Sequence, residues 1–488
     1  MQSEKKTAFV IALVIRVRFD ILYAHNNPGA SVMTTRIFAR QALMADGWRA
    51  NVTVEVDEAG LISGVSDTDG RADHRVGVLL PALSNVHSHS FQRAMAGLAE
   101  TRGPTAIDDF WTWRKVMYRF LEILSPDDIQ VIAAQVQMEM LEAGYAAQAE
   151  FHYLHHAPGG RAYGQVEETS LRHIEAARLT GIGFTHLPVL YMQGGLDGRA
   201  LEGGQLRFGC DLDAFQTLHS RLSGHFADLP DDFVLGVAPH SLRAVSAEGL
   251  SASVQLGQGG PVHIHAAEQV GEVREVVDAL GARPVRWLLN NMPVDHRWCF
   301  IHATQMDPTE TVDLAGSGAV AGLCPITEAN LGDGIFDGAR YLKAGGRIGI
   351  GSDSNVKIAL TEELRMLEVS QRLRDRQRVI LTDQTTPSNG RYLYERAARG
   401  GAQAIGRNAG RIEVGALADL TALDDANPAI CALKQDTVLD AWIFAGSDGV
   451  VSDVWAAGRH MVSGGRHIHH ERIARDFTQT IYRLREAL

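Results

Sequence analysis

The chain has 488 residues, of which 45% are hydrophobic and 21% charged, an ordinary globular composition that suits one large domain plus a smaller one. Its net charge of −12, without a run of Lys and Arg interleaved with aromatic residues, argues against nucleic acid as a partner. Four scattered cysteines without CxxC spacing argue against a disulfide framework and a thiolate zinc site, and they fit a reducing cytoplasm.

The N-terminal part of the chain contains a short apolar run at residues 9–15, which Arg16 and Arg18 follow closely. The run is far too short to span a bilayer and is at the lower limit for the apolar region of a signal peptide. Regular patterning begins only at Met33, so we expect residues 1–32 to be a disordered extension or a mis-assigned start. No other segment approaches transmembrane length, and we expect no membrane partner.

Both ends of the remaining chain have β-type patterns. Short strands and turns are predicted for residues 33–80, and a matching β-rich stretch returns at 405–465. We expect these two segments to pair into one small β-sandwich domain. The stretch 81–404 then forms a continuous domain between them, and residues 466–488 form a C-terminal helical tail.

The middle domain alternates strand and helix patterns, which is typical of parallel βαβ units. Eight apolar runs are predicted as strands: 83–87, 146–151, 183–190, 233–238, 261–265, 298–302, 319–324 and 347–351. Eight parallel strands, each followed by a helical stretch, favour a closed (β/α)8 TIM-type barrel over an open sheet. One helix has clear limits, with Ser125 as its predicted N-cap, Pro126 as its first residue and Gly144 at its end.

Polar side chains fall where the predicted strands end. These are His87 and His89 on the first strand, His240 on the fourth, His265 on the fifth, His302 on the sixth and Asp353 on the eighth. Because the carboxyl ends of barrel strands meet at one mouth, we expect these side chains to gather there. Neutral imidazoles and a carboxylate in one place suit a Zn²⁺ ion that keeps one position open for water.

Each of these residues also has a plainer interpretation. The HxH pattern is weak by itself, and His263 forms a second such pair with His265. We favour His265 as the ligand, since it lies nearer the strand end, and interpret His263 as a packed ring or as a ring that supports the ligands from behind. Taken alone, Asp353 fits a helix N-cap and His302 a hydrogen-bonded core histidine. Glu268 alone fits a solvated charge at a helix start, whereas beside a metal it could move a proton to a substrate nitrogen.

Several segments together resemble the amidohydrolase superfamily. They are Pro81-Ala-Leu-Ser-Asn-Val-His-Ser-His89, His265-Ala-Ala-Glu268, the sixth-strand His302 and Gly351-Ser-Asp353, and the stretch 410–420 resembles the strand that returns to that family's small β domain. Two-metal members carry a lysine at the end of the fourth strand, which here ends at His240 without a lysine in reach. The resemblance therefore implies the one-metal, deaminase-like branch. It implies one zinc ion per chain on His87, His89, His265 and Asp353, with Glu268, His302 and Asp353 as the catalytic, proton-handling groups.

Within that branch, the chain is similar to the formiminoglutamate deiminases of histidine breakdown. The segments that carry this similarity are 87–93, 110–114, 150–155, 239–243 and 324–335. The resemblance implies a hydrolase that converts N-formimino-L-glutamate into N-formyl-L-glutamate and ammonia. Such a substrate has two carboxylates and one amidine.

The substrate-binding residues that we expect are Gln92, Arg114, Tyr153, His240 and Arg243. Each arginine could clamp a carboxylate through two hydrogen bonds, while the other three could bind the carboxylate or amidine end. Taken singly, either arginine could instead be a surface ion pair or a helix cap, Tyr153 a packed aromatic ring and Gln92 a loop cap.

Two other functions stay open. One is a deaminase of the same branch that acts on a heterocycle such as guanine or cytosine, which needs stacking and amide contacts rather than two arginines; a substrate panel separates the two. The other is a catalytically inactive barrel that serves as a scaffold and need not copurify with stoichiometric zinc. We expect a small-molecule substrate, a homodimer and a cytoplasmic location.

Overall fold

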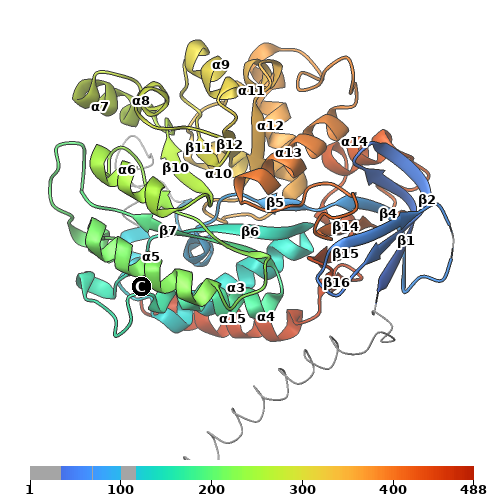
Figure 1. Ribbon diagram of the computed structural model, residues 1–488, viewed down its shortest axis with the longest axis horizontal. Coiled ribbons are helices and arrows are strands. Elements are labelled where there is room, and N and C mark those ends of the chain that lie inside the picture. Colours follow the sequence, from blue (N-terminus) through green and yellow to red (C-terminus); the bar gives the residue numbers. More distant parts are fainter. Residues whose placement is uncertain (1–33, 69, 101–116) are drawn as a thin grey trace, which may run out of the picture.

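The computed structural model describes residues 34–68, 70–100 and 117–488 (Figure 1). The expected extension at residues 1–32 and the expected substrate-binding residue Arg114 lie outside the described residues.

Eight parallel strands close into a barrel in the middle of the chain. They are β5 (Leu83–Asn85), β6 (Tyr145–His152), β7 (Gly183–Leu190), β8 (Phe233–Leu235) with its continuation β9 (Ala238–Pro239), β10 (Val262–Ala266), β11 (Trp298–His302), β12 (Val320–Leu323) and β13 (Arg347–Ile350). Neighbours pair in the order β10-β11-β12-β13-β5-β6-β7-β8, and a parallel bridge between Val237 and Val262 closes the ring. The predicted TIM-type barrel is confirmed, with its fourth strand interrupted at Gly236 and Val237.

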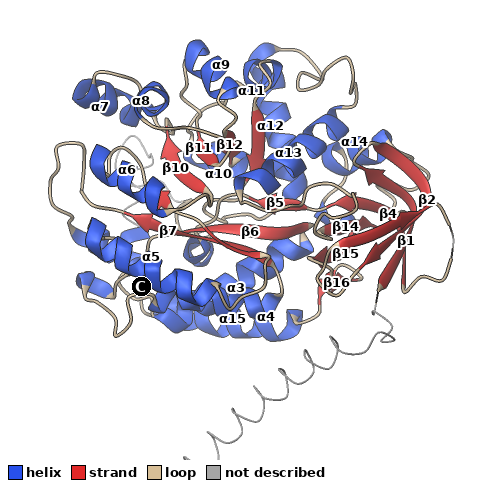
Figure 2. Cartoon of the chain, in the orientation of Figure 1, coloured by secondary structure: helices blue, strands red, loops and turns tan. Residues whose placement is uncertain are grey.

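Helices cover the outside of the barrel (Figure 2). They are α3 (Pro126–Glu142), α4 (Glu168–Thr180), α5 (Leu212–Phe226), α6 (Ala247–Leu256), α7 (Val270–Leu280), α8 (Pro284–Asn291), α9 (Pro308–Gly316), α11 (Gly338–Lys343), α12 (Leu360–Asp375) and α13 (Asn389–Ala404). The short helix α10 (Pro325–Leu331) instead lies at the barrel mouth. The predicted cap of α3 is confirmed, because the Ser125 side chain accepts a hydrogen bond from the Asp128 backbone N–H and Asp128 accepts one from Ser125 in return.

Strands from both chain ends pair into a second sheet beside the barrel, at the right of Figure 1. Its strands are β1 (Thr35–Met44), β2 (Gly47–Val56), β3 (Ile62–Ser66), β4 (His74–Pro81), β14 (Leu420–Leu423), β15 (Val451–Ala456), β16 (Arg459–Ser463) and β17 (Arg466–His467). The antiparallel pairing of β4 with β14 joins the two ends. A small β domain built from both termini is therefore confirmed, whereas its exact limits at 33–80 and 405–465 stay a prediction.

The last two helices pack against helices of the barrel. Helix α14 (Asp436–Phe444) contacts α12 and α13, and α15 (His470–Glu486) lies along α3. Ile473 of α15 is buried with Ala133, Ala134 and Met138 of α3. Within the described residues, no helix has both the length and the apolar character that a membrane crossing requires.

Candidate active site

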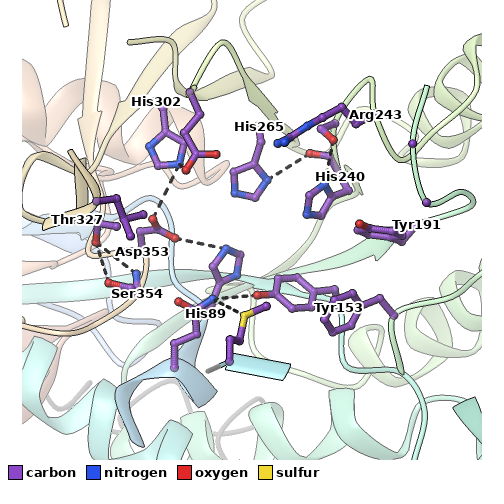
Figure 3. A pocket seen from close by; sticks show the side chains of 18 of the residues that line it. His89, Tyr153, Tyr191, His240, Arg243, His265, His302, Thr327, Asp353 and Ser354 are labelled. Atoms are coloured by element: carbon purple, nitrogen blue, oxygen red, sulfur yellow. Dashed lines mark hydrogen bonds and ion pairs between the residues drawn. The ribbon is translucent and has the colours of Figure 1, made fainter. Parts of the chain in front are cut away.

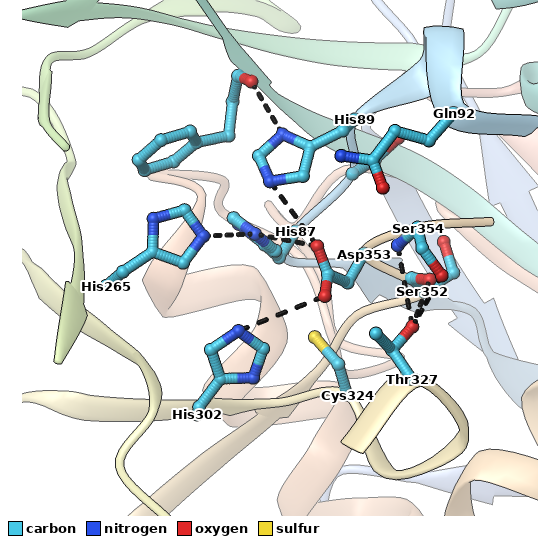
Figure 4. Close-up of polar contacts among 12 residues, drawn as sticks. His87, His89, Gln92, His265, His302, Cys324, Thr327, Ser352, Asp353 and Ser354 are labelled. Carbon is cyan, nitrogen blue, oxygen red and sulfur yellow. Dashed lines mark hydrogen bonds and ion pairs between the residues drawn. The ribbon is translucent and has the colours of Figure 1, made fainter. Parts of the chain in front are cut away.

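Four of the predicted residues converge at the carboxyl end of the barrel. One ligand-type atom from each of His87, His89, His265 and Asp353 lies within 4.8 Å of the others, and all four side chains are buried. His87 Nε2 and His89 Nε2 are each 3.3 Å from Asp353 Oδ1, and His265 Nε2 is 3.1 Å from His87 Nε2 (Figure 4). The structure thus brings the expected metal ligands within reach of one ion.

The backbone around these ligands connects the first and last strands of the barrel. The N–H groups of Ser352 and Asp353 donate to the His87 carbonyl, and the His89 N–H donates to the Asp353 carbonyl. Gly351 allows this approach, since a Cβ there would lie 2.8 Å from the His87 Cβ. Asp353 itself has a φ of +45°, a left-handed conformation that is costly for a residue with a side chain.

Hydrogen bonds on the far sides of two rings determine where their free lone pairs point. His89 Nδ1 is 2.9 Å from the Phe151 carbonyl and His265 Nδ1 is 3.2 Å from the His240 carbonyl. A carbonyl only accepts, so both Nδ1 atoms carry the proton and both Nε2 atoms present a lone pair. The donor set of imidazole nitrogens and one carboxylate, with ring orientations fixed from behind, fits a divalent cation such as Zn²⁺.

The charge states of the cluster also suit a metal ion. Burial lowers the pKa of His87 to about 3 and lowers the pKa values of His89 and His265 below the usual range, so the three rings are neutral near pH 7. Burial alone would raise the pKa of Asp353, but the neighbouring rings of His87, His89 and His302 lower it. The carboxylate is therefore ionised and can act as a ligand.

Two further predicted residues lie beside the cluster. His302 Nε2 is 3.9 Å from both Glu268 Oε1 and Asp353 Oδ2, and its Nδ1 is 3.2 Å from Glu328 Oε1. Burial alone would lower the pKa of His302, but Glu268, the hydrogen bond to Glu328 and Asp353 raise it to about 10. Burial raises the pKa of Glu268, which is 5% exposed. The pair can hold and exchange protons next to the metal ligands.

The pocket above the cluster contains the described substrate-binding candidates (Figure 3). Gln92, Tyr153, His240 and Arg243 all line it together with the metal ligands His89, His265 and Asp353. Gln92 Nε2 donates to the Tyr153 hydroxyl over 2.9 Å. Burial lowers the pKa of Arg243, but the carboxylates of Glu272 and Glu268 outweigh it and raise that pKa, so the guanidinium stays charged at the pocket wall.

Some of the plainer interpretations are wrong. Asp353 is not a helix N-cap, because the next helix, α12, has its N-cap at Ala359. Glu268 is buried rather than solvated, and its backbone N–H donates to Glu272 Oε2. The interpretation of His263 as a packed ring, in contrast, agrees with the structure: the ring is buried outside the ligand cluster, with its Nε2 2.7 Å from the Ala404 carbonyl.

The sequence interpretation missed several residues of the site. Glu328 orients His302, and Tyr191, Arg199 and Glu275 line the pocket. Two of them had a signal in the sequence. Glu328 lies in the motif at 324–335, a few residues after the seventh strand, and Tyr191 directly follows the third. Arg199 lies on a loop and Glu275 on a helix, without a recognisable pattern.

Comparison with known proteins adds four findings. The model of the amidohydrolase family matches residues 78–461. Formimidoylglutamate deiminase of Pseudomonas aeruginosa is 48% identical over 449 residues, which cover 91% of this chain and 98% of the relative. The crystal structure of an amidohydrolase from Brucella melitensis superposes with a TM-score of 0.87 at 44% identity, covering 92% of this chain and 99% of that one. An adenosine deaminase from Xanthomonas campestris, solved with bound zinc, shares the fold with a TM-score of 0.78 at 21% identity, covering 93% and 98%.

Proposed function

The chain belongs to the amidohydrolase family, and from this premise we propose that it catalyses the hydrolytic deimination of N-formimino-L-glutamate to N-formyl-L-glutamate and ammonia, a step of histidine degradation. The observation that carries the proposal is the buried cluster of His87, His89, His265 and Asp353 at the base of a pocket that also contains Arg243. The similarity to the Pseudomonas aeruginosa deiminase extends over nearly the whole of both chains and supports the same reaction.

We assign the cluster to one zinc ion per chain. When bound, zinc acts as a Lewis acid that lowers the pKa of a water molecule towards neutrality. The imidazole ligands are held neutral by burial, and the Phe151 and His240 carbonyls orient two of them. The ligands at the base of the cavity are thus neutral and correctly oriented for the ion before substrate binds.

The protein's own residues handle the protons of the reaction. Asp353 Oδ2, 3.9 Å from His302 Nε2, accepts a proton from the attacking water, and the His302 cation stabilises the negative charge on the oxygen that adds to the formimino carbon. Glu268, whose pKa is raised by burial, passes a proton to the imino nitrogen of the substrate. The remaining hydroxyl proton then moves to the same nitrogen, and the proton taken up by Asp353 restores Glu268. The carbon–nitrogen bond breaks, ammonia leaves with the equivalent of both water protons, and a formyl carbonyl remains.

Arg243 is the described residue best suited to bind a substrate carboxylate. Its guanidinium lines the pocket and is charged, so it can donate two parallel hydrogen bonds to a carboxylate. Tyr153 and Gln92, already joined by a hydrogen bond, offer a hydroxyl and an amide in the same pocket, and His240 offers a ring nitrogen. We propose Arg114 for the second carboxylate on the sequence similarity alone.

An ammonia-release assay tests the proposal. Purified protein loaded with zinc is offered N-formimino-L-glutamate, N-formimino-L-aspartate, adenosine, guanine and cytosine. Turnover of N-formimino-L-glutamate above the others supports the deiminase, whereas turnover of a heterocycle alone would replace it with a nucleobase or nucleoside deaminase. The homodimer and the cytoplasmic location belong to the same proposal, and light scattering tests the dimer.

A further inference from the structure

A second buried carboxylate lies behind the metal-binding segment and plays no part in the mechanism above. Glu150, on β6, is 1% exposed and does not line the pocket. Among the described residues it accepts four hydrogen bonds: from Ser88 Oγ over 3.0 Å, from the Ser90 backbone N–H over 2.8 Å, from Ser90 Oγ, and from Gln148 Nε2 over 2.6 Å. Burying a carboxylate costs free energy, and supplying it with four hydrogen-bond donors commits several other groups, so this arrangement is expected to serve a function.

The donors alternate with the metal ligands along one segment. Ser88 and Ser90 follow His87 and His89 directly, so the carboxylate of Glu150 holds the side of the segment that faces away from the cluster. The next residue of β6, Phe151, holds the same segment by its backbone, since its N–H donates to the Ser88 carbonyl and its carbonyl accepts from His89 Nδ1. Two consecutive residues of β6 therefore fix both the backbone and one ring of the HxH pair.

The same network reaches the fourth ligand. Asn355 Nδ2 donates to Ser88 Oγ and to the Asp353 carbonyl, each over 3.1 Å, and Asn355 Oδ1 accepts from Ser352 Oγ over 2.6 Å. Asp353 and Asn355 both have positive φ values, +45° and +53°. Such conformations persist only when neighbouring contacts enforce them. Ser88 thus connects the two, because its hydroxyl donates to the Glu150 carboxylate and accepts from Asn355 of the strained Asp353 loop.

The chemistry of the donors favours a carboxylate over an amide at this position. The Ser90 backbone N–H can only donate, and it faces Glu150 Oε1. Burial raises the pKa of Glu150 to about 7, while the four hydrogen bonds act in the opposite direction. The residue is therefore tied to the segment through its full set of acceptor sites rather than through packing alone.

We propose that Glu150 is a positioning residue for the metal centre: through Ser88 and Ser90 it holds His87 and His89, and through Asn355 it supports the Asp353 loop, so that the four ligand atoms converge before metal binds. The inference rests on the proposed function in one respect, because it requires that the cluster binds zinc. Residues behind the ligands of metal sites commonly change metal affinity 10- to 100-fold when they are replaced.

The test compares zinc affinities of the full-length protein, stripped of metal and titrated against a chelator of known affinity. Glu150→Gln keeps the size of the side chain and one acceptor oxygen, and Gln148 can rotate its unpaired Oε1 towards the new amide, so this variant is expected to fold and to bind zinc about tenfold more weakly. Glu150→Leu removes all four hydrogen bonds and should bind about 100-fold more weakly. The matched control is Glu368→Gln, which alters an equally buried carboxylate on α12 that accepts from the Ile380 and Leu381 N–H groups, and it should bind zinc as wild type does.

A second set of measurements distinguishes a positioning role of Glu150 from a general contribution to protein stability. At saturating zinc, Glu150→Gln should keep the wild-type KM, since Glu150 does not line the pocket. Its zinc-free unfolding temperature should fall no further than that of Glu368→Gln, which also loses an ion pair with Arg372. Wild-type zinc affinity in both Glu150 variants, or an equal loss in Glu368→Gln, would overturn the inference alone. Failure of the wild-type protein to bind zinc would overturn the proposed function as well.

Discussion

Replacing Glu268 with Gln isolates the proton transfer to the leaving nitrogen. The carboxylate lies 3.9 Å from His302 Nε2 and is buried at the pocket wall. Its backbone is anchored independently, because Glu272 accepts hydrogen bonds from the N–H groups of Ala267 and Glu268. The substitution therefore removes a carboxyl group that can take up and release a proton, while the local fold and the four metal ligands stay in place.

The expected loss follows from the role of the group. General acid–base catalysis by a positioned side chain contributes about 10²- to 10⁴-fold, which corresponds to about 2.7–5.5 kcal/mol of the activation barrier. We expect kcat of Glu268→Gln on N-formimino-L-glutamate to fall within that range. The pKa of His302 should fall as well, because Glu268 is the strongest of the groups that raise it.

Ammonia release under steady-state conditions gives kcat, and metal analysis of the same sample gives zinc content. Glu368→Gln, the same change at a buried carboxylate on α12, should retain wild-type kcat. A Glu268→Gln protein that contains full zinc and turns over substrate at the wild-type rate would refute the proton-transfer role.

Three further changes test other parts of the site. Arg243→Met removes charged hydrogen bonds worth about 1.5–3 kcal/mol to a substrate carboxylate, so KM should rise about 10- to 100-fold with kcat less affected, and an unchanged KM would contradict that contact. Gly351→Ala would place a Cβ 2.8 Å from the His87 Cβ, which is too close. Calorimetry should therefore show a loss of about 1–3 kcal/mol in unfolding free energy, and wild-type stability would contradict the steric conflict. Burial lowers the pKa of His155 to about 4 in the folded protein, whereas the same ring in the unfolded chain has a pKa near 6.5. As the pH falls, the unfolded chain therefore binds a proton at His155 before the folded protein does, and the stability present above pH 6.5 is lost towards pH 4. The amide of His155→Gln can keep the hydrogen bond to the Val189 carbonyl but does not titrate. Between pH 6.5 and 4 this variant should show a slope of unfolding free energy against pH that is smaller by up to about 1.4 kcal/mol per pH unit. Denaturant titrations that give the wild-type slope would contradict this.

The barrel could be predicted because each of its strands is a short apolar run between turn residues, and buried parallel strands impose that pattern locally. The candidate ligands could be found for a related reason. A polar residue at the carboxyl end of such a run, or just beyond it, must lie at the barrel mouth, and this holds for His265, His302 and Asp353.

The residues that the sequence could not reveal act across strands. The roles of Glu328 and Glu150 depend on the order of the strands in the barrel, which places Glu328 against His302 and Glu150 against Ser88. Neither neighbour is close in the chain, so no spacing pattern records the contact. The positive φ of Asp353 is likewise invisible in the sequence, since tertiary hydrogen bonds rather than local preference enforce it.

Anomalous diffraction at the zinc absorption edge, from crystals of the zinc-loaded protein, tests the central claim most directly. The account predicts one peak per chain, about 2.0–2.2 Å from the Nε2 atoms of His87, His89 and His265 and from a carboxylate oxygen of Asp353. A peak bound to other residues, or none at the barrel mouth, would contradict it.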